Sequence, residues 1–327
     1  MRSTVEKQLH IGDCRASSPW ALPLTSADVD ALVCDGGPAS PARRAALKAA
    51  PGFAAAVRKT SAALVAIHHG NRVLNAIIND RGRFFVTLFV LDLHFRRPDD
   101  GIGLTPGRLK ERCVKQGVCS ATRAGALLAL MKLRGYVRTA PGAAPADRRR
   151  RELVPTAKLI AHQRARWHCH FSAAAPLLLE ATHALEMLDR PDFMPRLVRL
   201  ISAHHCAGFR ITDHIPSTGL FSERNGGMFV VFSLLAIAEE EELRRQAPIQ
   251  TSISGLARSI SASRAHVIKL LKDAEERGLL KRPRSGGVIL MPPLVEDFHE
   301  FFALSYLLLS HFARVIGDCS ETVRVRT

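Results

Sequence analysis

The sequence predicts a mainly α-helical fold with small β hairpins, built from two copies of one module. The main observation is an internal repeat at an offset of 143 residues, which aligns residues 120–135 with residues 263–278. A shorter amphipathic segment precedes each copy, at 109–114 and 256–260. A basic, turn-rich stretch that returns to an apolar sequence follows each copy, as in a two-stranded hairpin. Two helices and a hairpin therefore make up the repeated unit.

Each copy of the repeat predicts one amphipathic helix. Ser120 and Ser263 suit the N-cap position, because a hydroxyl there accepts a hydrogen bond from the first helical turn. Gly135 and Gly278 end the two segments, since glycine tolerates the left-handed conformation that closes many helices. The apolar stripes, at helical spacing, are Ala124, Leu127, Leu128 and Met131 in the first copy and Val267, Leu270, Leu271 and Ala274 in the second.

The second pair of helices has the sharper motif. It runs through Leu256-Ala257 and Ile260 to residues 262–267, Ala-Ser-Arg-Ala-His-Val. Small residues at such a turn let two helices cross closely, and the spacing is that of a helix-turn-helix. This string resembles the helix-turn-helix of bacterial repressors.

The hairpins carry a second resemblance. The stretch from Asp147-Arg148-Arg149 to Thr156 is similar to the wing of MarR-type regulators, whose hairpin has an Asp-Arg pattern and ends at a threonine that starts the next helix. The second hairpin, at 281–291, lacks that aspartate. The chain thus resembles a MarR-like regulator over residues 60–175 and 225–316. The resemblance implies two winged helix-turn-helix modules, joined by a helical pseudo-dimerisation region.

The remaining segments follow in chain order. Residues 1–45, rich in Ser, Pro, Asp and Gly, predict a loose arm; 46–187 form the first module with its flanking helices, 188–224 a linker with a connecting helix, and 225–327 the second module with a C-terminal helix. Further helices are predicted at 45–50, 53–67, 84–95, 158–186 with a break near Pro176, 228–238 and 295–315.

The flanking helices suggest an internal two-fold arrangement. MarR-type proteins form dimers through terminal helices, so the resemblance implies that a tandem copy builds the same arrangement from helices around 60–80, 158–186, 196–206 and 295–315. We therefore expect a monomer with internal pseudo-two-fold symmetry.

Composition favours a polyanionic partner. The chain has 46 Lys and Arg against 30 Asp and Glu, a formal charge of +16, and its isoelectric point is about 10.3. Such a balance is typical of nucleic-acid binding. The longest apolar stretch, 228–238, is too short to span a bilayer. Seven scattered cysteines suggest reduced thiols in a cytoplasm. We expect double-stranded DNA as the partner and a cytoplasmic, nucleoid-associated protein.

The two modules differ in the chemistry they offer to DNA. Arg264, His266 and Lys269 are donors on the predicted solvent face of the second recognition helix, where they suit guanine edges or phosphates. The first helix offers mostly small residues, but its hairpin holds four arginines suited to phosphates or a narrow minor groove. We therefore expect an asymmetric operator, read mainly by the second module. The residues predicted to contact DNA are Ser120, Thr122, Arg123, Arg148, Arg149, Arg150, Arg151, Ser263, Arg264, His266, Lys269, Lys281, Arg282 and Arg284.

Other classes of function remain open. A plasmid replication initiator also resembles tandem winged helices in one chain. The clusters at 168–170 and 204–206 hold histidine and cysteine, which bind zinc or copper, but neighbouring residues on a helix point apart. Cys113 and Cys119 could sense oxidants, although buried cysteines are common core residues. A helical enzyme is a further alternative, yet the chain lacks a nucleophile elbow and a phosphate-binding loop. We expect no catalytic residue, metal or cofactor.

The resemblance also implies control by a small-molecule effector. Effectors of MarR-like proteins sit between the helical region and the winged helix. The corresponding cleft here would be lined by 84–95, Trp167, Phe171 and 228–232. These residues equally suit a hydrophobic core.

Overall fold

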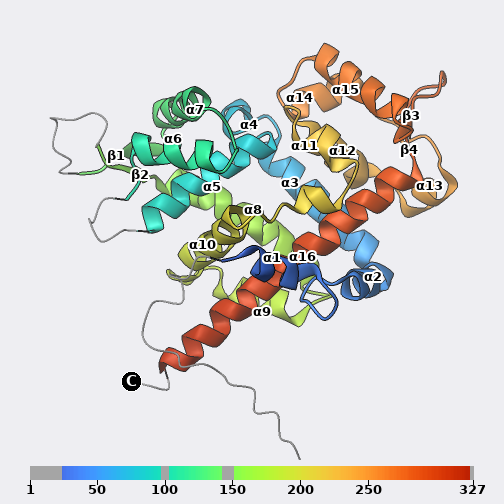
Figure 1. Ribbon diagram of the computed structural model, residues 1–327. Coiled ribbons are helices and arrows are strands. Elements are labelled where there is room, and N and C mark those ends of the chain that lie inside the picture. Colours follow the sequence, from blue (N-terminus) through green and yellow to red (C-terminus); the bar gives the residue numbers. More distant parts are fainter. Residues whose placement is uncertain (1–23, 97–102, 142–150, 325–327) are drawn as a thin grey trace, which may run out of the picture.

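The computed structural model describes residues 24–96, 103–141 and 151–324. Over these ranges the chain is mainly helical, with two small antiparallel sheets of two strands each (Figure 1), as the sequence predicts. The elements in chain order are α1 (Ser26–Val33), α2 (Pro41–Ala49), α3 (Phe53–His68), α4 (Arg72–Ile77), α5 (Arg81–Phe95), α6 (Pro106–Lys115), α7 (Ala121–Leu133), β1 (Val137–Thr139), β2 (Leu153–Pro155), α8 (Ala157–Ala174), α9 (Leu179–Met187), α10 (Phe193–Cys206), the 3-10 helix η1 (Ile211–His214), α11 (Thr218–Ser222), α12 (Gly227–Ile237), α13 (Glu240–Arg245), α14 (Ile253–Ser259), α15 (Arg264–Glu276), β3 (Leu280–Lys281), β4 (Ile289–Leu290) and α16 (Pro292–Arg324).

Two helix–hairpin units repeat the same order of elements. The first unit contains α6, α7, β1 and β2, and the second contains α14, α15, β3 and β4. Each hairpin also pairs with the segment that precedes its helices, through bridges between Leu104 and Leu153 and between Ile249 and Val288. Figure 1 shows α7 at the upper left of the molecule and α15 at the upper right.

The caps of α7 and α15 confirm the predicted repeat. The Ser120 hydroxyl accepts a hydrogen bond from the backbone N–H of Arg123 (3.2 Å), and the Ser263 hydroxyl from that of His266 (3.1 Å). Gly135 and Gly278, just beyond the helices, have φ values of +71° and +70°. A side chain is disfavoured in this left-handed conformation, so the two glycines fix where the helices end.

The predicted apolar stripes face inward. All eight stripe residues are buried, and they pack α7 and α15 against the shorter helices α6 and α14. Thr156 is the N-cap of α8, as predicted. Its hydroxyl, however, donates to the carbonyl of Gly135 at 2.7 Å and so joins the start of α8 to the end of α7.

A central layer of helices carries the two units. α3 packs on α8 and α12, while α16 packs on α2, α8, α9 and α10, and Figure 1 shows α16 crossing the molecule diagonally. Helices from the two halves of the chain pack on each other. α3 of the first half packs on α12 of the second, and α10 of the second half packs on α5 of the first. The helices expected around 60–80, 158–186, 196–206 and 295–315 therefore do contact one another.

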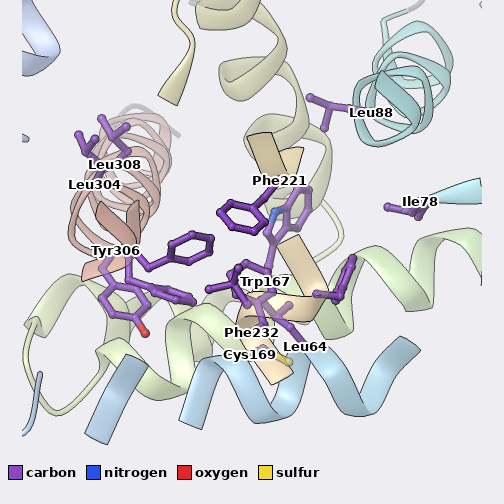
Figure 2. Packing of buried hydrophobic residues seen from close by; sticks show 14 of the residues in the cluster. Leu64, Ile78, Leu88, Trp167, Cys169, Phe221, Phe232, Leu304, Tyr306 and Leu308 are labelled. Atoms are coloured by element: carbon purple, nitrogen blue, oxygen red, sulfur yellow. The ribbon is translucent and has the colours of Figure 1, made fainter. Parts of the chain in front are cut away.

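Aromatic side chains cluster in the core between these helices. Figure 2 shows Leu64 of α3, Trp167 of α8 and Phe232 of α12 close together, with Tyr306 of α16 to their left in the same core. The buried Tyr306 hydroxyl lies 2.6 Å from the Thr60 hydroxyl and donates to the Ala56 carbonyl at 3.0 Å. The polar end of this side chain is thus satisfied inside the core.

The expectation of a loose arm over 1–45 is wrong for its second half, and residues 1–23 lie outside the described residues. Thr25 and Asp28 form a reciprocal capping box that starts α1. Leu32 and Ala39 are buried in the core. The apolar residues of this segment are too few to show a period, but the capping box is a local signal for a helix.

The region 188–224 is more regular than its prolines suggest, because it contains the whole of α10. Pro195 is the third residue of α10. An N–H in the first turn has no partner within the helix, so proline is tolerated there. Among the described residues, no helix is both long and apolar enough to cross a membrane.

Candidate functional site

The outer face of α15 presents cations to solvent. Arg264 and Ser263 are exposed, and Arg264 has no hydrogen-bond or ion-pair partner within the described part of the chain. The Lys269 ammonium is also exposed and lies 3.6 Å from the Asp273 carboxylate. Such a weak surface pair is easily exchanged for another anion. Arg264 and Lys269 therefore both face solvent, which is the placement expected of them.

His266 is placed differently from the expectation of a solvent-facing donor. The side chain is half-buried, and its Nε2 lies 2.8 Å from the backbone carbonyl of Asn225, two residues before α12. Arg123 occupies the equivalent third position of α7, and it donates to the Asp80 carboxylate at 3.1 Å. Both residues tie a helix of the repeat to the start of α5 or α12, because the first turn of each helix abuts that point.

The segments that precede α5 and α12 also contact each other. Asn79 and Asn225 each lie two residues before their helix, α5 and α12. The Asn79 side-chain amide donates to the side-chain oxygen of Asn225 at 3.0 Å, and the backbone carbonyl of Asn79 accepts from the N–H of Gly226 at 2.9 Å. Segments equivalent in sequence therefore meet at this contact.

The hairpin residues of the second unit divide into two groups. Lys281 and Arg284 are exposed. The Arg282 guanidinium instead donates two hydrogen bonds, of 2.7 and 2.9 Å, to Oε2 of Glu275 in α15. The Arg282 backbone N–H donates to the other oxygen of the same carboxylate. Arg282 therefore holds the hairpin against α15 and is a poor candidate for DNA contact.

The predicted contacts of the first unit are only partly covered. Ser120, the N-cap of α7, and Thr122 in its first turn are exposed. Arg148, Arg149 and Arg150 lie outside the described residues. Arg151, next to β2, is half-buried.

Sequence reasoning missed three exposed cations in the same surfaces. Lys272 follows Lys269 by three residues and therefore lies on the same face of α15. Arg258 of α14 and Lys110 of α6 are also exposed. A Cβ on Gly125 of α7 would lie 2.8 Å from the Lys110 side chain, so this glycine leaves room for that lysine. The spacing of Lys272 was the signal that could have identified it.

A cavity of about 220 Å³ lies between the two halves of the chain. Side chains of α5, α8, α10, α12 and α16 line it, and most of its wall is apolar and aromatic. The predicted cleft residues Phe84, Phe85, Trp167 and 228–229, with Phe232, lie in this wall. Residues 86–95, Phe171, Val230 and Val231 do not line the cavity; Phe171, Val230 and Val231 are part of the surrounding core.

The cavity wall also holds arginines and histidines. Burial lowers the pKa of His170 and of His205 to about 3, and nearby arginines add to the effect, so both rings are neutral near pH 7. Nδ1 of His170 and both ring nitrogens of His205 have no hydrogen-bond partner in the described structure. A neutral imidazole carries one N–H donor, and an unsatisfied buried donor is costly.

The cysteines and histidines do not assemble a metal site in the described part of the chain, where no group of three potential ligands occurs. Cys34, Cys113, Cys119, Cys169 and Cys206 are free thiols. Burial, with the neighbouring Cys119, raises the pKa of Cys113 to about 12, so this thiol is almost entirely protonated near pH 7. A thiol in this state reacts slowly with oxidants.

No family model matches this chain, and no curated protein or solved structure is significantly similar to it. The resemblance to MarR-type regulators therefore rests on the sequence motifs alone.

Proposed function

We propose that this protein is a MarR-like transcriptional regulator that binds double-stranded DNA sequence-specifically, with two winged helix-turn-helix modules in one chain. The observation that carries the proposal is the second helix–hairpin unit. There, α15 follows a short helix, precedes a hairpin, and keeps Arg264 and Lys269 exposed on its outer face. A helix of this kind enters the major groove with its first turns at the base edges.

The second unit reads bases in this proposal. Arg264 is the first residue of α15 and has no internal partner in the described structure, so its guanidinium is available for a bidentate contact with guanine. Lys269 and Lys272 follow on the same helix, where phosphate contacts suit their flexible ammonium groups. Lys281 and Arg284 extend this basic surface along the hairpin.

The first unit mainly supplies affinity. The exposed face of α7 carries Thr122, Ala126 and Ala129, which offer few hydrogen bonds to base edges. The arginine run 148–151 in the hairpin would bind phosphates or a narrow minor groove. The operator is therefore asymmetric, with most of its sequence information under the second unit.

A single chain acts as a pseudo-dimer in this proposal. Support comes from the exchanged packing of α3 on α12 and α10 on α5, and from the contact between Asn79 and Asn225. Two recognition helices related in this way can enter successive major grooves, about 34–36 Å apart. Light scattering during gel filtration is expected to give the mass of one chain, 35.8 kDa. A stable species of twice that mass would contradict the internal pseudo-dimer.

We place the protein in the cytoplasm, associated with the nucleoid, where such a regulator meets its operator. Control by a small effector belongs to the same proposal. Asn79 and Asp80 line the cavity. Asn79 donates to Asn225, just before α12, and Asp80 accepts from Arg123 of α7. A ligand in the cavity would therefore change how the two recognition helices are held.

The test is selection of bound sequences from a pool of random duplexes, followed by titration of the best site and a scrambled duplex at two salt concentrations. Arg264→Ala is expected to weaken binding to the selected site about 5- to 150-fold, as expected for loss of a bidentate base contact, and to change binding to the scrambled duplex far less.

The matched control is Arg314→Ala. This arginine is half-exposed on the distal half of α16 and pairs with Asp318 at 3.0 Å. The Arg314→Ala substitution should leave the affinities for the selected site and for the scrambled duplex unchanged. Equal losses on both duplexes for Arg264→Ala would remove its role in base reading, and a failure to enrich any sequence would contradict the proposal.

A further inference from the structure

A second cavity, of about 190 Å³, lies apart from the one between the two halves of the chain. Its wall comes from the loop between α1 and α2, from the first turns of α2 and α9, and from the middle of α16. The two cavities share no lining residue. Figure 1 shows α9 in the lower half of the molecule, away from α7 and α15 at the top. The second cavity is therefore separate from the surfaces proposed to bind DNA.

Two opposite charges line this cavity without pairing with each other. Arg43 is the third residue of α2, and Glu180 is the second residue of α9. Among the described residues, neither side chain forms an ion pair or donates or accepts a hydrogen bond. Arg44, the next residue of α2, instead pairs with Glu300 at 2.8 Å. One cation and one anion of the cavity wall are thus left for a ligand.

A histidine beside Arg43 adds a hydrogen-bond donor. Burial, together with the nearby charges of Arg314, His204 and Arg43, lowers the pKa of His311 to about 4, so the ring is neutral near pH 7. Arg314 pairs with Asp318 at 3.0 Å, and its guanidinium also lies 3.4 Å from Nδ1 of His311. A guanidinium can only donate, so Nδ1 is the acceptor and the ring proton lies on Nε2.

The Ser310 hydroxyl is a further polar group of the wall. Ser310 is 3% exposed, and its hydroxyl has no hydrogen-bond partner in the described structure. A buried hydroxyl without a partner is costly, so this group also calls for a ligand atom. Leu178 and Leu307 line the same cavity and give it an apolar side.

These groups together select the charge of the ligand. A simple anion would pair with Arg43 but would leave the Glu180 carboxylate facing a like charge. A simple cation would pair with Glu180 and would face Arg43. A molecule that carries both charges on a short apolar body satisfies the whole wall.

We propose that this cavity binds a free α-amino acid with an apolar side chain. The carboxylate of the ligand pairs with Arg43, whose planar fork donates two parallel hydrogen bonds, and accepts from the Ser310 hydroxyl. The ammonium group pairs with Glu180, and the side chain contacts Leu178 and Leu307. A cavity of roughly 150 Å³ accepts a benzene ring, so the 190 Å³ here accommodates an amino acid of the size of leucine. The site does not require the protein to bind DNA.

The test compares L-leucine with two fragments of it by calorimetry without DNA. The fragment 4-methylpentanoate lacks the amine, and 3-methylbutan-1-amine lacks the carboxylate, while both keep the apolar chain. Leucine is expected to bind with one-to-one stoichiometry and at least about tenfold more tightly than either fragment, because each fragment loses one charged hydrogen-bonding group.

Two variants assign the two charges of the ligand to their partners. Arg43→Met should remove the advantage of leucine over the amine and leave the affinity for the amine unchanged. Glu180→Gln should remove the advantage of leucine over 4-methylpentanoate and leave the affinity for that carboxylate unchanged. Each variant therefore keeps one fragment as an internal control for an intact cavity.

The matched controls are Arg190→Met and Glu186→Gln. Arg190 follows α9 and lies 3.8 Å from Asp192, and Glu186 is exposed on α9. Neither residue lines the cavity, so both variants should bind leucine as the unchanged protein does.

Three outcomes would each overturn the proposal: no binding of leucine, equal affinities for leucine and its fragments, or a preference for leucine that survives in either folded variant. Far-UV circular dichroism shows whether the variants are folded. If one of them does not fold, the other variant and the comparison of the three probes still decide. Since no DNA is present, the outcome is separate from the test of DNA binding.

Discussion

The buried ion pair between Asp92 of α5 and Arg112 of α6 makes an asymmetric prediction. The Arg112 guanidinium donates to the Asp92 carboxylate at 2.6 Å. The aspartate side chain is 0% exposed and the arginine side chain 20% exposed. Removing the arginine leaves a carboxylate that cannot reach water, whereas removing the aspartate leaves a cation that can. We therefore expect Arg112→Met to cost more stability than Asp92→Ala.

The magnitudes follow from these surroundings. Breaking a buried pair costs about 3–5 kcal/mol when the remaining charge is uncompensated. Because Arg96 still lies 3.7 Å from Asp92, Arg112→Met should lie near the lower end of this range. Asp92→Ala should cost about 2 kcal/mol of stability, close to the contribution of a single charged hydrogen bond. In this variant the Arg112 guanidinium still lies over the Phe89 ring, 5.4 Å from its centroid, and still reaches solvent. The double variant should be more stable than Arg112→Met alone, because it buries no charge.

Urea denaturation followed by far-UV circular dichroism measures all of these values at pH 7. Arg96→Met is the control, since Arg96 lies farther from the same carboxylate, at 3.7 Å, and is 37% exposed. It should cost less than about 1 kcal/mol. Equal losses for Arg112→Met and Asp92→Ala, or a double variant less stable than Arg112→Met, would refute the reasoning.

Three further predictions concern stability. Burial holds the pKa of His205 at about 3 in the folded protein, against 6.5 ordinarily, so between these pH values the unfolded chain binds a proton that the folded protein does not. The free energy of unfolding should therefore fall as the pH drops from about 6.5. His205→Gln should reduce that fall, as measured by urea titrations at neutral and mildly acidic pH. Gly227→Ala would place a Cβ 2.2 Å from the Phe221 carbonyl oxygen and should lower the melting temperature by several degrees, whereas a Cβ at Gly219 meets no atom within 4 Å and Gly219→Ala should not lower it. Ser263→Ala removes the N-cap of α15 and should cost about 1 kcal/mol; a calorimetric loss below about 0.3 kcal/mol would contradict a capping role.

The candidate surface could be predicted from the sequence only as far as local signals reach. The helical faces that carry Arg264 and Lys269 follow from the spacing of buried residues, and both side chains are exposed as expected. His266 fits the same pattern, yet it bonds to Asn225, a residue 41 positions away. Helical periodicity gives the direction of a side chain around its own axis, but not which other segment lies there.

Sequence alone determined where the repeated helices begin and end. Caps and apolar stripes act within a few residues, so Ser120, Ser263, Gly135 and Gly278 mark α7 and α15 without any knowledge of the fold. The tertiary structure decided the rest. Trp167 indicates a cleft beside α8, but the sequence does not show that its neighbour Arg166 has no carboxylate partner among the described residues. That follows from how α5, α10, α12 and α16 surround it. Such an environment depends on contacts between distant parts of the chain, and those contacts leave no periodic signal in the sequence.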